Sequence, residues 1–182
     1  MTLAARSRAA LAAIAFAAAA ILAAAQGITS AGIQWTVPAG WTEQPPRPMR
    51  VATYGVPAAK GAEAGECGIF YFGKSQGGSP QENISRWGAQ FEGSPAPVTS
   101  VETVNGMKVH RAQTSGTYLA PSGPMMQSSG KKPGYRLLGA IVEAPEGLVF
   151  FKCTGPAPTI AAGERSFEGL VKSIKKAPST KF

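Results

Sequence analysis

Few side chains in this sequence could do acid–base or nucleophilic chemistry. All ten acidic residues are glutamate, and His110 is the single histidine. This composition excludes a Ser-His-Asp triad, an EF-hand calcium loop and any site that needs two histidines. The chemistry that is left is hydrolysis by a glutamate that acts with His110 or with a serine. Such a site would require Glu66, Glu102 or Glu143 to converge with His110 in a concave pocket.

His110 has no carboxylate close to it in the sequence. It lies in a predicted strand, between Lys108 and Arg111. A histidine in this setting is typical of a structural or exposed residue, because nothing nearby is placed to orient its ring. We therefore predict that the protein is not an enzyme, and we assign no catalytic, cofactor-binding or metal-binding residue.

Side chains that could bind a soft metal are few. Met125 and Met126 could bind copper(I), together with Cys67 and Cys153. A metal or small-molecule carrier is therefore a second alternative, although two adjacent methionines lack a spaced third ligand. The cysteines also suit a disulfide, since an even number of cysteines in an oxidising compartment favours pairing. Free cysteines are also common core residues, and both states stay open at this stage.

A glycine-bearing turn at residues 73–78 precedes a predicted helix. Gly77 and Gly78 could hold a phosphate at the start of that helix. The turn lacks the Lys-Ser/Thr pair of a P-loop, and Glu82 would repel an anion, so we do not expect phosphate binding. This turn and the long polar segment 119–134 are nevertheless the first places to look for a binding site, because long loops are often functional.

Alternating apolar residues predict a fold rich in strands. The 22 glycines and 15 prolines favour many turns and short strands over a helical bundle. Residues 67–72 are apolar on both alternating faces, which is typical of a strand covered on both sides. Asn105-Gly106 predicts a hairpin turn. The expected strands are 33–37, 49–56, 67–72, 97–101, 104–118, 135–142 and 148–153.

Two helices are expected to pack against this sheet. Ser79 can cap the first one, Pro80 suits its first position, and Glu82 completes a capping box, which predicts a helix over 80–91. Thr159 can cap the second. The apolar stripe of the second helix and the lysines of its last turns are Ile160, Phe167, Leu170, Val171, Ile174, Lys172, Lys175 and Lys176. The predicted fold class is α+β, with a central antiparallel β-sheet flanked by helices.

Residues 1–25 have the three parts of a secretory signal peptide. Arg6 and Arg8 form a basic region, an apolar run follows, and three alanines at 23–25 form a cleavage site. The run is too rich in alanine for a permanent membrane anchor. We predict a single domain over residues 26–182, with a flexible loop at 119–134, and a protein that is secreted or periplasmic after cleavage.

The chain without residues 1–25 is moderately basic, with 16 basic and 10 acidic residues and a net charge of +6. The basic residues are scattered, apart from Lys131-Lys132 and the C-terminal lysines. A nucleic-acid partner would need a basic stripe with interleaved aromatic residues, so none is expected. The charge suits peripheral contact with anionic envelope polymers or lipid headgroups.

Several motifs together resemble a group of uncharacterised secreted bacterial proteins with the PsbP-like alpha/beta/alpha sandwich. The motifs that carry the resemblance are 35–41 (WTVPAGW), 70–73 (FYFG), 83–91 with Trp87, 116–118 (GTY), 136–143 and 150–156. They cover nearly all of the predicted domain, but they consist of core and turn residues, so the resemblance implies a fold more than a function.

The resemblance also implies a role, because PsbP-like domains are mostly non-enzymatic and bind or stabilise larger assemblies, often at a membrane surface. We therefore expect a non-catalytic secreted or envelope accessory protein that binds a protein partner in the cell envelope or a small ligand. The resemblance supplies no binding residues, and the oligomeric state is left open.

Overall fold

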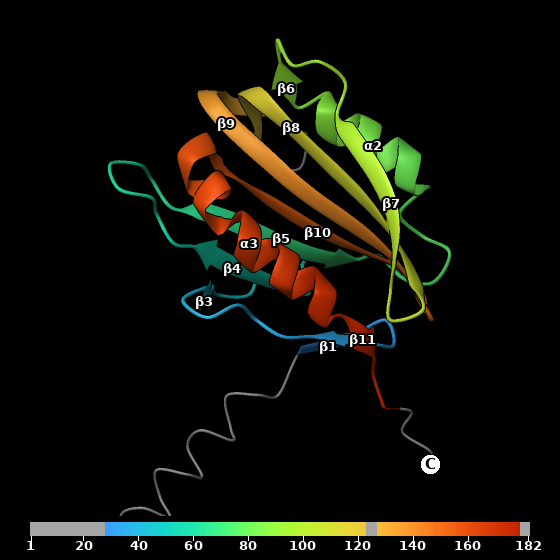
Figure 1. Cartoon of the computed structure of the whole chain (residues 1–182). Helices are drawn as coiled ribbons and strands as arrows, with labels where there is room; N and C mark the ends of the chain where they lie inside the picture. Colours follow the sequence, from blue (N-terminus) through green and yellow to red (C-terminus); the bar gives the residue numbers. More distant parts are fainter. Residues whose placement is uncertain (1–27, 123–126, 179–182) are drawn as a thin grey trace, which may run out of the picture.

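Antiparallel strands make up most of the structure, and two helices pack against them (Figure 1). The computed structural model describes residues 28–122 and 127–178. The elements are β1 (Ile28–Ser30), β2 (Ile33–Trp35), β3 (Thr42–Glu43), β4 (Ala52–Val56), β5 (Gly65–Tyr71), α2 (Pro80–Gly88), β6 (Phe91–Glu92), β7 (Val98–Val104), β8 (Met107–Ser122), β9 (Gln127–Ala144), β10 (Gly147–Pro156), α3 (Ala157–Ser173) and β11 (Lys175–Lys176). The predicted α+β class is observed, with the sheet as its dominant part.

The large sheet has the strand order β3-β4-β5-β10-β9-β8-β6, and β7 also pairs with β8. All of these pairs are antiparallel. Asn105 and Gly106 form the predicted hairpin turn between β7 and β8, with φ angles of 48° and 79°. A second, small sheet has the order β1-β2-β11, so the last strand of the chain pairs with one of the first.

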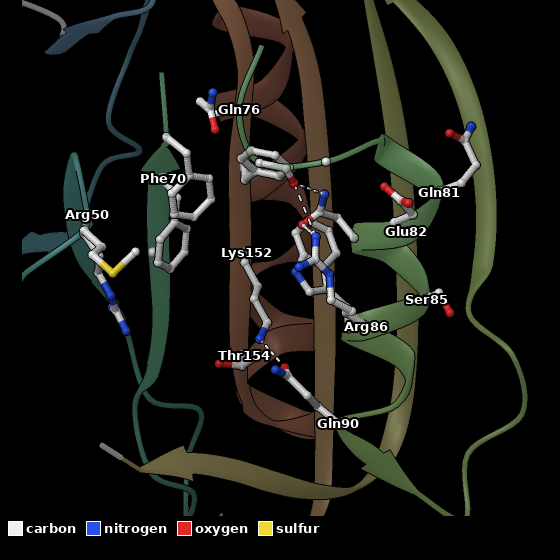
Figure 2. A pocket seen from close by; sticks show the side chains of 18 of the residues that line it. Arg50, Phe70, Gln76, Gln81, Glu82, Ser85, Arg86, Gln90, Lys152 and Thr154 are labelled. Carbon is white, nitrogen blue, oxygen red and sulfur yellow. Dashed lines mark hydrogen bonds between the residues drawn. The ribbon is translucent and has the colours of Figure 1, made fainter. Parts of the chain in front are cut away.

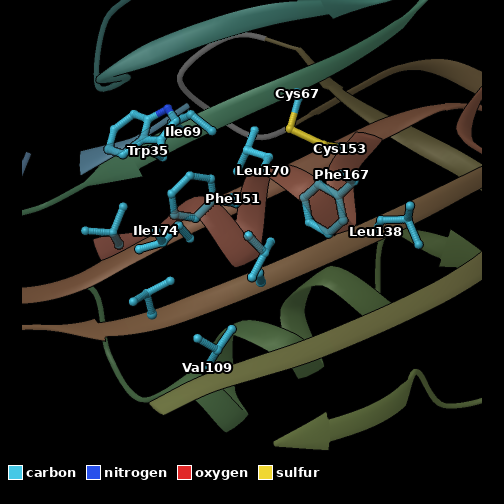
Figure 3. Close-up of a cluster of buried hydrophobic side chains, with 14 of the residues drawn as sticks. Trp35, Cys67, Ile69, Val109, Leu138, Phe151, Cys153, Phe167, Leu170 and Ile174 are labelled. Atoms are coloured by element: carbon cyan, nitrogen blue, oxygen red, sulfur yellow. A yellow bond between two sulfur atoms is a disulfide. The ribbon is translucent and has the colours of Figure 1, made fainter. Parts of the chain in front are cut away.

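The larger hydrophobic core lies between α3 and one face of the large sheet (Figure 3). Trp35 and Phe151 meet edge to face, with their ring centroids 5.2 Å apart. The Trp35 indole Nε1 donates a hydrogen bond to the Tyr54 hydroxyl over 3.2 Å, so its polar group is satisfied although the side chain is buried. Trp35 and Trp41 are both core residues.

The helix α2 covers only part of the opposite face. Its N-terminus has the predicted capping box, in which Ser79 and Glu82 bond reciprocally, but the helix ends at Gly88 and Phe91 belongs to β6. Trp87 packs down onto Gly139 of β9, where an added Cβ would lie 2.3 Å from the Trp87 Cζ3 atom. The predicted flanking of the sheet by helices is therefore observed in part, with α3 over one face and the shorter α2 over part of the other.

The predicted loop at 119–134 is wrong for most of its length. Residues 119–122 continue β8 and residues 127–134 continue β9, with pairs such as Leu119 with Lys131 and Ser122 with Gln127. The register between β8 and β9 is irregular at two places, between Gly116 and Tyr118 and between Leu119 and Pro121. Gly130, Pro133 and Gly134 lie on β9 opposite these irregularities. Residues 123–126, which include the two candidate methionines, lie outside the described residues.

The C-terminal helix also differs from the prediction at both ends. The helix begins at Ala157, so Thr159 lies inside it and does not cap it. The Thr159 hydroxyl donates to the Glu63 carbonyl over 2.7 Å and accepts from the Ala59 N–H over 3.1 Å. These two bonds connect the segment between β4 and β5 to the helix. Lys175 and Lys176 leave the helix and form β11, where backbone pairing with β2 satisfies their polar groups.

Cys67 and Cys153 form a disulfide. They lie directly opposite each other on β5 and β10, and both are buried beside α3 (Figure 3). The sequence left this pairing open, and the strand register decides it by placing the two side chains on the same face of neighbouring strands.

The predicted signal peptide at 1–25 lies outside the described residues. Within the described ranges, neither helix has the length and apolar character required to span a bilayer.

Replacing both cysteines by alanine should lower the free energy of unfolding by about 3 kcal/mol, because the disulfide closes a long loop of the unfolded chain. The two cysteines are 86 positions apart in the sequence. Urea denaturation of the double variant and of the oxidised wild type measures the difference, with thiol titration of the unfolded wild type as the control. Equal stabilities, or two free thiols in the wild type, would contradict the disulfide.

Gly139→Ala should destabilise the protein by about 2 kcal/mol, because the added methyl group collides with the Trp87 ring. Gly169→Ala is the matched control. Gly169 lies in α3 with nothing within 4 Å of its added Cβ, so this change should stabilise the protein by about 0.5 to 1 kcal/mol through helix propensity. Thermal unfolding of both variants tests the pair. A loss of stability of the same size in both would contradict the packing of Trp87 against Gly139.

Candidate functional site

A groove lies beside α2, on the face of the large sheet that this helix leaves partly open. Its volume is about 1310 Å³. As Figure 2 shows, α2 forms one wall, Phe70 of β5 lies on the other side, and Lys152 and Thr154 of β10 lie along the floor between them. The turn at residues 76–78 closes one end.

Aromatic rings line much of this groove. The rings of Phe70 and Phe72 are stacked with their centroids 6.2 Å apart, and Phe72 lies 5.5 Å from Phe150. Trp87 and Tyr118 line the groove as well. Phe72 leaves 40% of its surface exposed, which is unusual for a large aromatic side chain outside a binding surface. The arrangement can bind the apolar body of a ligand or partner.

Lys152 is the distinctive polar group of the floor. Its ammonium donates to the Gln90 Oε1 atom and lies 5.6 Å from the centroid of the Tyr118 ring. Among the described residues, no carboxylate lies within ion-pair distance of it. Burial lowers the pKa of Lys152 to about 8, assisted by the positive charge of Arg50 and opposed by the negative charge of Glu66.

The other charges on the β5 side of the groove are paired with one another. Glu66 bonds to Arg50 over 2.6 Å and to Arg47 over 2.7 Å. The Arg50 guanidinium also lies over the Phe70 ring, 5.3 Å from its centroid. These contacts fix the edge of the groove and leave the Glu66 carboxylate engaged by two cations.

The glycine turn at the end of the groove does not form an anion site. The Glu82 carboxylate accepts the Ser79 N–H over 2.8 Å, and this bond lowers the pKa of Glu82. The Gly77 carbonyl faces the helix and accepts hydrogen bonds from Asn83 and Arg86. A carboxylate therefore already occupies the position at the helix N-terminus that a phosphate would need, in agreement with the expectation from the sequence.

One of the three candidate glutamates, Glu143, contacts His110, and the other two do not. The His110 Nε2 atom lies 2.7 Å from the Glu143 carboxylate, and this hydrogen bond lowers the pKa of Glu143. Glu102 instead bonds to Arg111 over 2.8 Å, and Glu66 lies in the groove, where His110 is not among the lining residues. His110 is buried, and its contact with Glu143 lies between the neighbouring strands β8 and β9, away from the groove.

Two of the four ligands proposed for a metal carrier, the cysteines, lie in the described part of the chain. Cys67 and Cys153 are consumed by their disulfide, and Met125 and Met126 fall on undescribed positions. Within residues 28–122 and 127–178, no group of three or more histidine, cysteine or acidic side chains is placed to hold a metal ion.

Sequence reasoning did not single out Lys152 or the aromatic wall of the groove, which is formed by Phe70, Phe72 and Phe150. The available signal was a single charge inside the apolar run 148–153, which the strand β10 places on the groove side. The glycine turn at 73–78, named as a place to look, does line the groove at Gly77 and Gly78. The described side chains of the segment 119–134, which are those at 119, 120 and 130–134, are not among the groove lining.

No known family model matches this sequence, and no curated protein matches it. The fold does match solved structures. PsbP (CyanoP) from Synechocystis sp. PCC 6803 superposes with a TM-score of 0.52 at 8% identity, over 82% of this chain and 89% of that one. Protein PA94 of unknown function from Pseudomonas aeruginosa gives a TM-score of 0.48 at 15% identity, over 79% of this chain and 90% of that one. The PsbP-like fold expected from the sequence is confirmed.

Lys152→Met should raise the free energy of unfolding at pH 7 by about 1 kcal/mol, because the folded protein no longer desolvates an ammonium. The pKa of Lys152 is depressed in the folded state, so the wild type gains stability as pH rises from 8 towards 10.5, where only the unfolded chain still holds the proton. Urea denaturation at pH 7 and pH 9.5 should show the gap between variant and wild type closing.

Lys108→Met is the control for this measurement, since Lys108 is exposed and pairs with Glu143 outside the groove. Its stability difference from the wild type should not change over the same pH range. A constant gap for Lys152→Met would show that the ammonium is not desolvated.

Proposed function

We propose that this protein is a non-catalytic binding protein, exported to the cell envelope or beyond it, and that it binds its partner or ligand in the groove beside α2. The observation that carries this proposal is a groove of about 1310 Å³ whose aromatic wall includes Phe72, exposed over 40% of its surface. Exposed aromatic side chains gathered in a concavity are typical of binding sites.

Export is supported by the signal-peptide pattern of residues 1–25 and by the disulfide. A buried disulfide between paired strands persists in oxidising compartments and is rare in the cytosol. An accessory role is supported by the PsbP-like fold, as a fold-level analogy.

A non-catalytic role is supported by the chemistry of the groove. Glu66 is held by two arginines and Glu82 by the helix N-terminus, so neither is placed as a general base. His110 lies outside the groove. The groups that line it suit recognition by packing and charge, with the aromatic wall as the contact surface.

Photo-crosslinking from inside the groove tests the proposal. A photoreactive amino acid at Gln76, an exposed residue that lines the groove, should give a specific adduct in the native envelope or in the secreted fraction. The same group at Val98, which is 65% exposed on β7 and lies outside the groove, should not give this adduct.

A second variant makes the result specific to the aromatic wall. Phe72→Glu should reduce the adduct from Gln76 by about tenfold or more, because it places a charge in the apolar contact. Val101→Glu, which changes a 60% exposed valine on β7, should leave it unchanged. Equal adducts from Gln76 and Val98, or no effect of Phe72→Glu, would overturn the proposal.

A further inference from the structure

Building on the proposed function, we propose that the ligand of the groove is an organic carboxylate with an apolar body. Its head group pairs with the Lys152 ammonium, and its body packs against the aromatic wall formed by Phe70, Phe72 and Phe150. This inference names the chemical class of the ligand and depends on the groove being the binding surface.

The first step of the argument is the unbalanced charge of Lys152. An ammonium has three donors, and within the described part of the chain the one hydrogen bond that it makes is to the amide oxygen of Gln90. The Tyr118 ring offers a second, weaker contact. A desolvated cation with these partners is stabilised strongly by an anion that arrives with the ligand.

The second step is that the acidic groups of the groove are already engaged. Glu66 is neutralised by Arg47 and Arg50, and Glu82 is held by Ser79. A cationic ligand would find neither carboxylate free. The charge that remains available on the floor is positive, so electrostatic complementarity selects an anion.

The third step is the shape of the ligand. The groove is lined by three cations, Arg50, Arg86 and Lys152, and by two carboxylates, those of Glu66 and Glu82. The excess of one positive charge suits a carboxylate better than a doubly charged phosphate ester. The stacked Phe70 and Phe72 and the nearby Phe150 provide the apolar contact, and Figure 2 shows Phe70 directly across the floor from the helix side of the groove. The volume exceeds what a small organic acid needs.

A charge series on one alkyl chain tests the inference. Isothermal titration calorimetry at pH 7 with decanoate, decanol and decylammonium should give binding of decanoate about tenfold tighter or more than decanol, with decylammonium weakest. A parallel pair, 2-naphthoate and its neutral alcohol, tests an aromatic body in place of the aliphatic chain. Preference for the acid in either pair supports the proposal, and the tighter pair shows whether the body is aliphatic or aromatic.

Variants assign the preference to Lys152. Lys152→Met should bind decanoate and decanol with similar affinity, while Lys152→Arg should keep the preference. Lys108→Met, which removes a lysine outside the groove, should behave as the wild type. Because Lys152→Met should fold at least as stably as the wild type, loss of the preference would not reflect unfolding.

The preference should also weaken between pH 7 and pH 9.5 in the wild type and stay constant in Lys152→Met. Deprotonation of Lys152, with its pKa of about 8, removes the charge that the carboxylate contacts. The other ionisable side chains facing it are Arg50, Arg86, Glu66, Glu82 and Tyr118. Arginine and glutamate ordinarily keep their charges across this range, and burial raises the pKa of Tyr118 further above it.

Equal affinity of the wild type for the acid and its alcohol in both pairs, an acid preference that survives in Lys152→Met, or no binding of any probe would overturn the inference. These outcomes differ from failure of the proposed function. A specific adduct from Gln76 that depends on Phe72, combined with no carboxylate preference, would leave the binding groove in place and remove only its assignment to organic acids.

Discussion

The register in which β5 pairs with β10 determines which side chains face the core beneath α3 and which face the groove. Alternate residues of a strand point to opposite faces of the sheet. In β10, Phe151 and Cys153 therefore enter the core beneath α3, while Phe150 and Lys152 face the groove. A shift of β10 by one residue would turn Lys152 towards the core beneath α3 and would turn Cys153 away from Cys67. The covalent link between Cys67 and Cys153 fixes the same register that builds the groove floor.

The helix α2 sets the width of the groove. Gly139 allows the Trp87 ring to approach the backbone of β9, and the helix consequently sits close to the β8–β9 part of the sheet. With nine residues, the helix is too short and too far to one side to cover β5 and β10 as well. The groove is therefore a product of incomplete coverage: one face of the sheet has a long helix over its core, and the other has a short one.

Local patterns predicted the parts of the fold that depend on neighbours in sequence. The capping box at Ser79, the Asn105-Gly106 turn and the apolar strands were all readable in this way. The groove was not, because its members come from distant segments: Lys152 meets Gln90 across 62 positions of the chain. The composition of the segment 119–134 predicted a loop. Sequence alone does not show that β8 and β9 stay paired through a stretch rich in proline and glycine, with irregularities in their register. His110 contacts one of its three candidate carboxylates, that of Glu143, and neither residue lines the groove.

The small sheet joins the two ends of the described chain, because Lys175 and Lys176 pair with Gln34 and Ile33 of β2. Such a pairing closes almost the whole chain into one loop, and the entropy of that closure is lost before the contact forms. Proteins whose contacts are this far apart in sequence fold slowly. The small sheet needs β11 and the large sheet needs β10, so neither can reach its full native pairing before nearly all of the described chain is available.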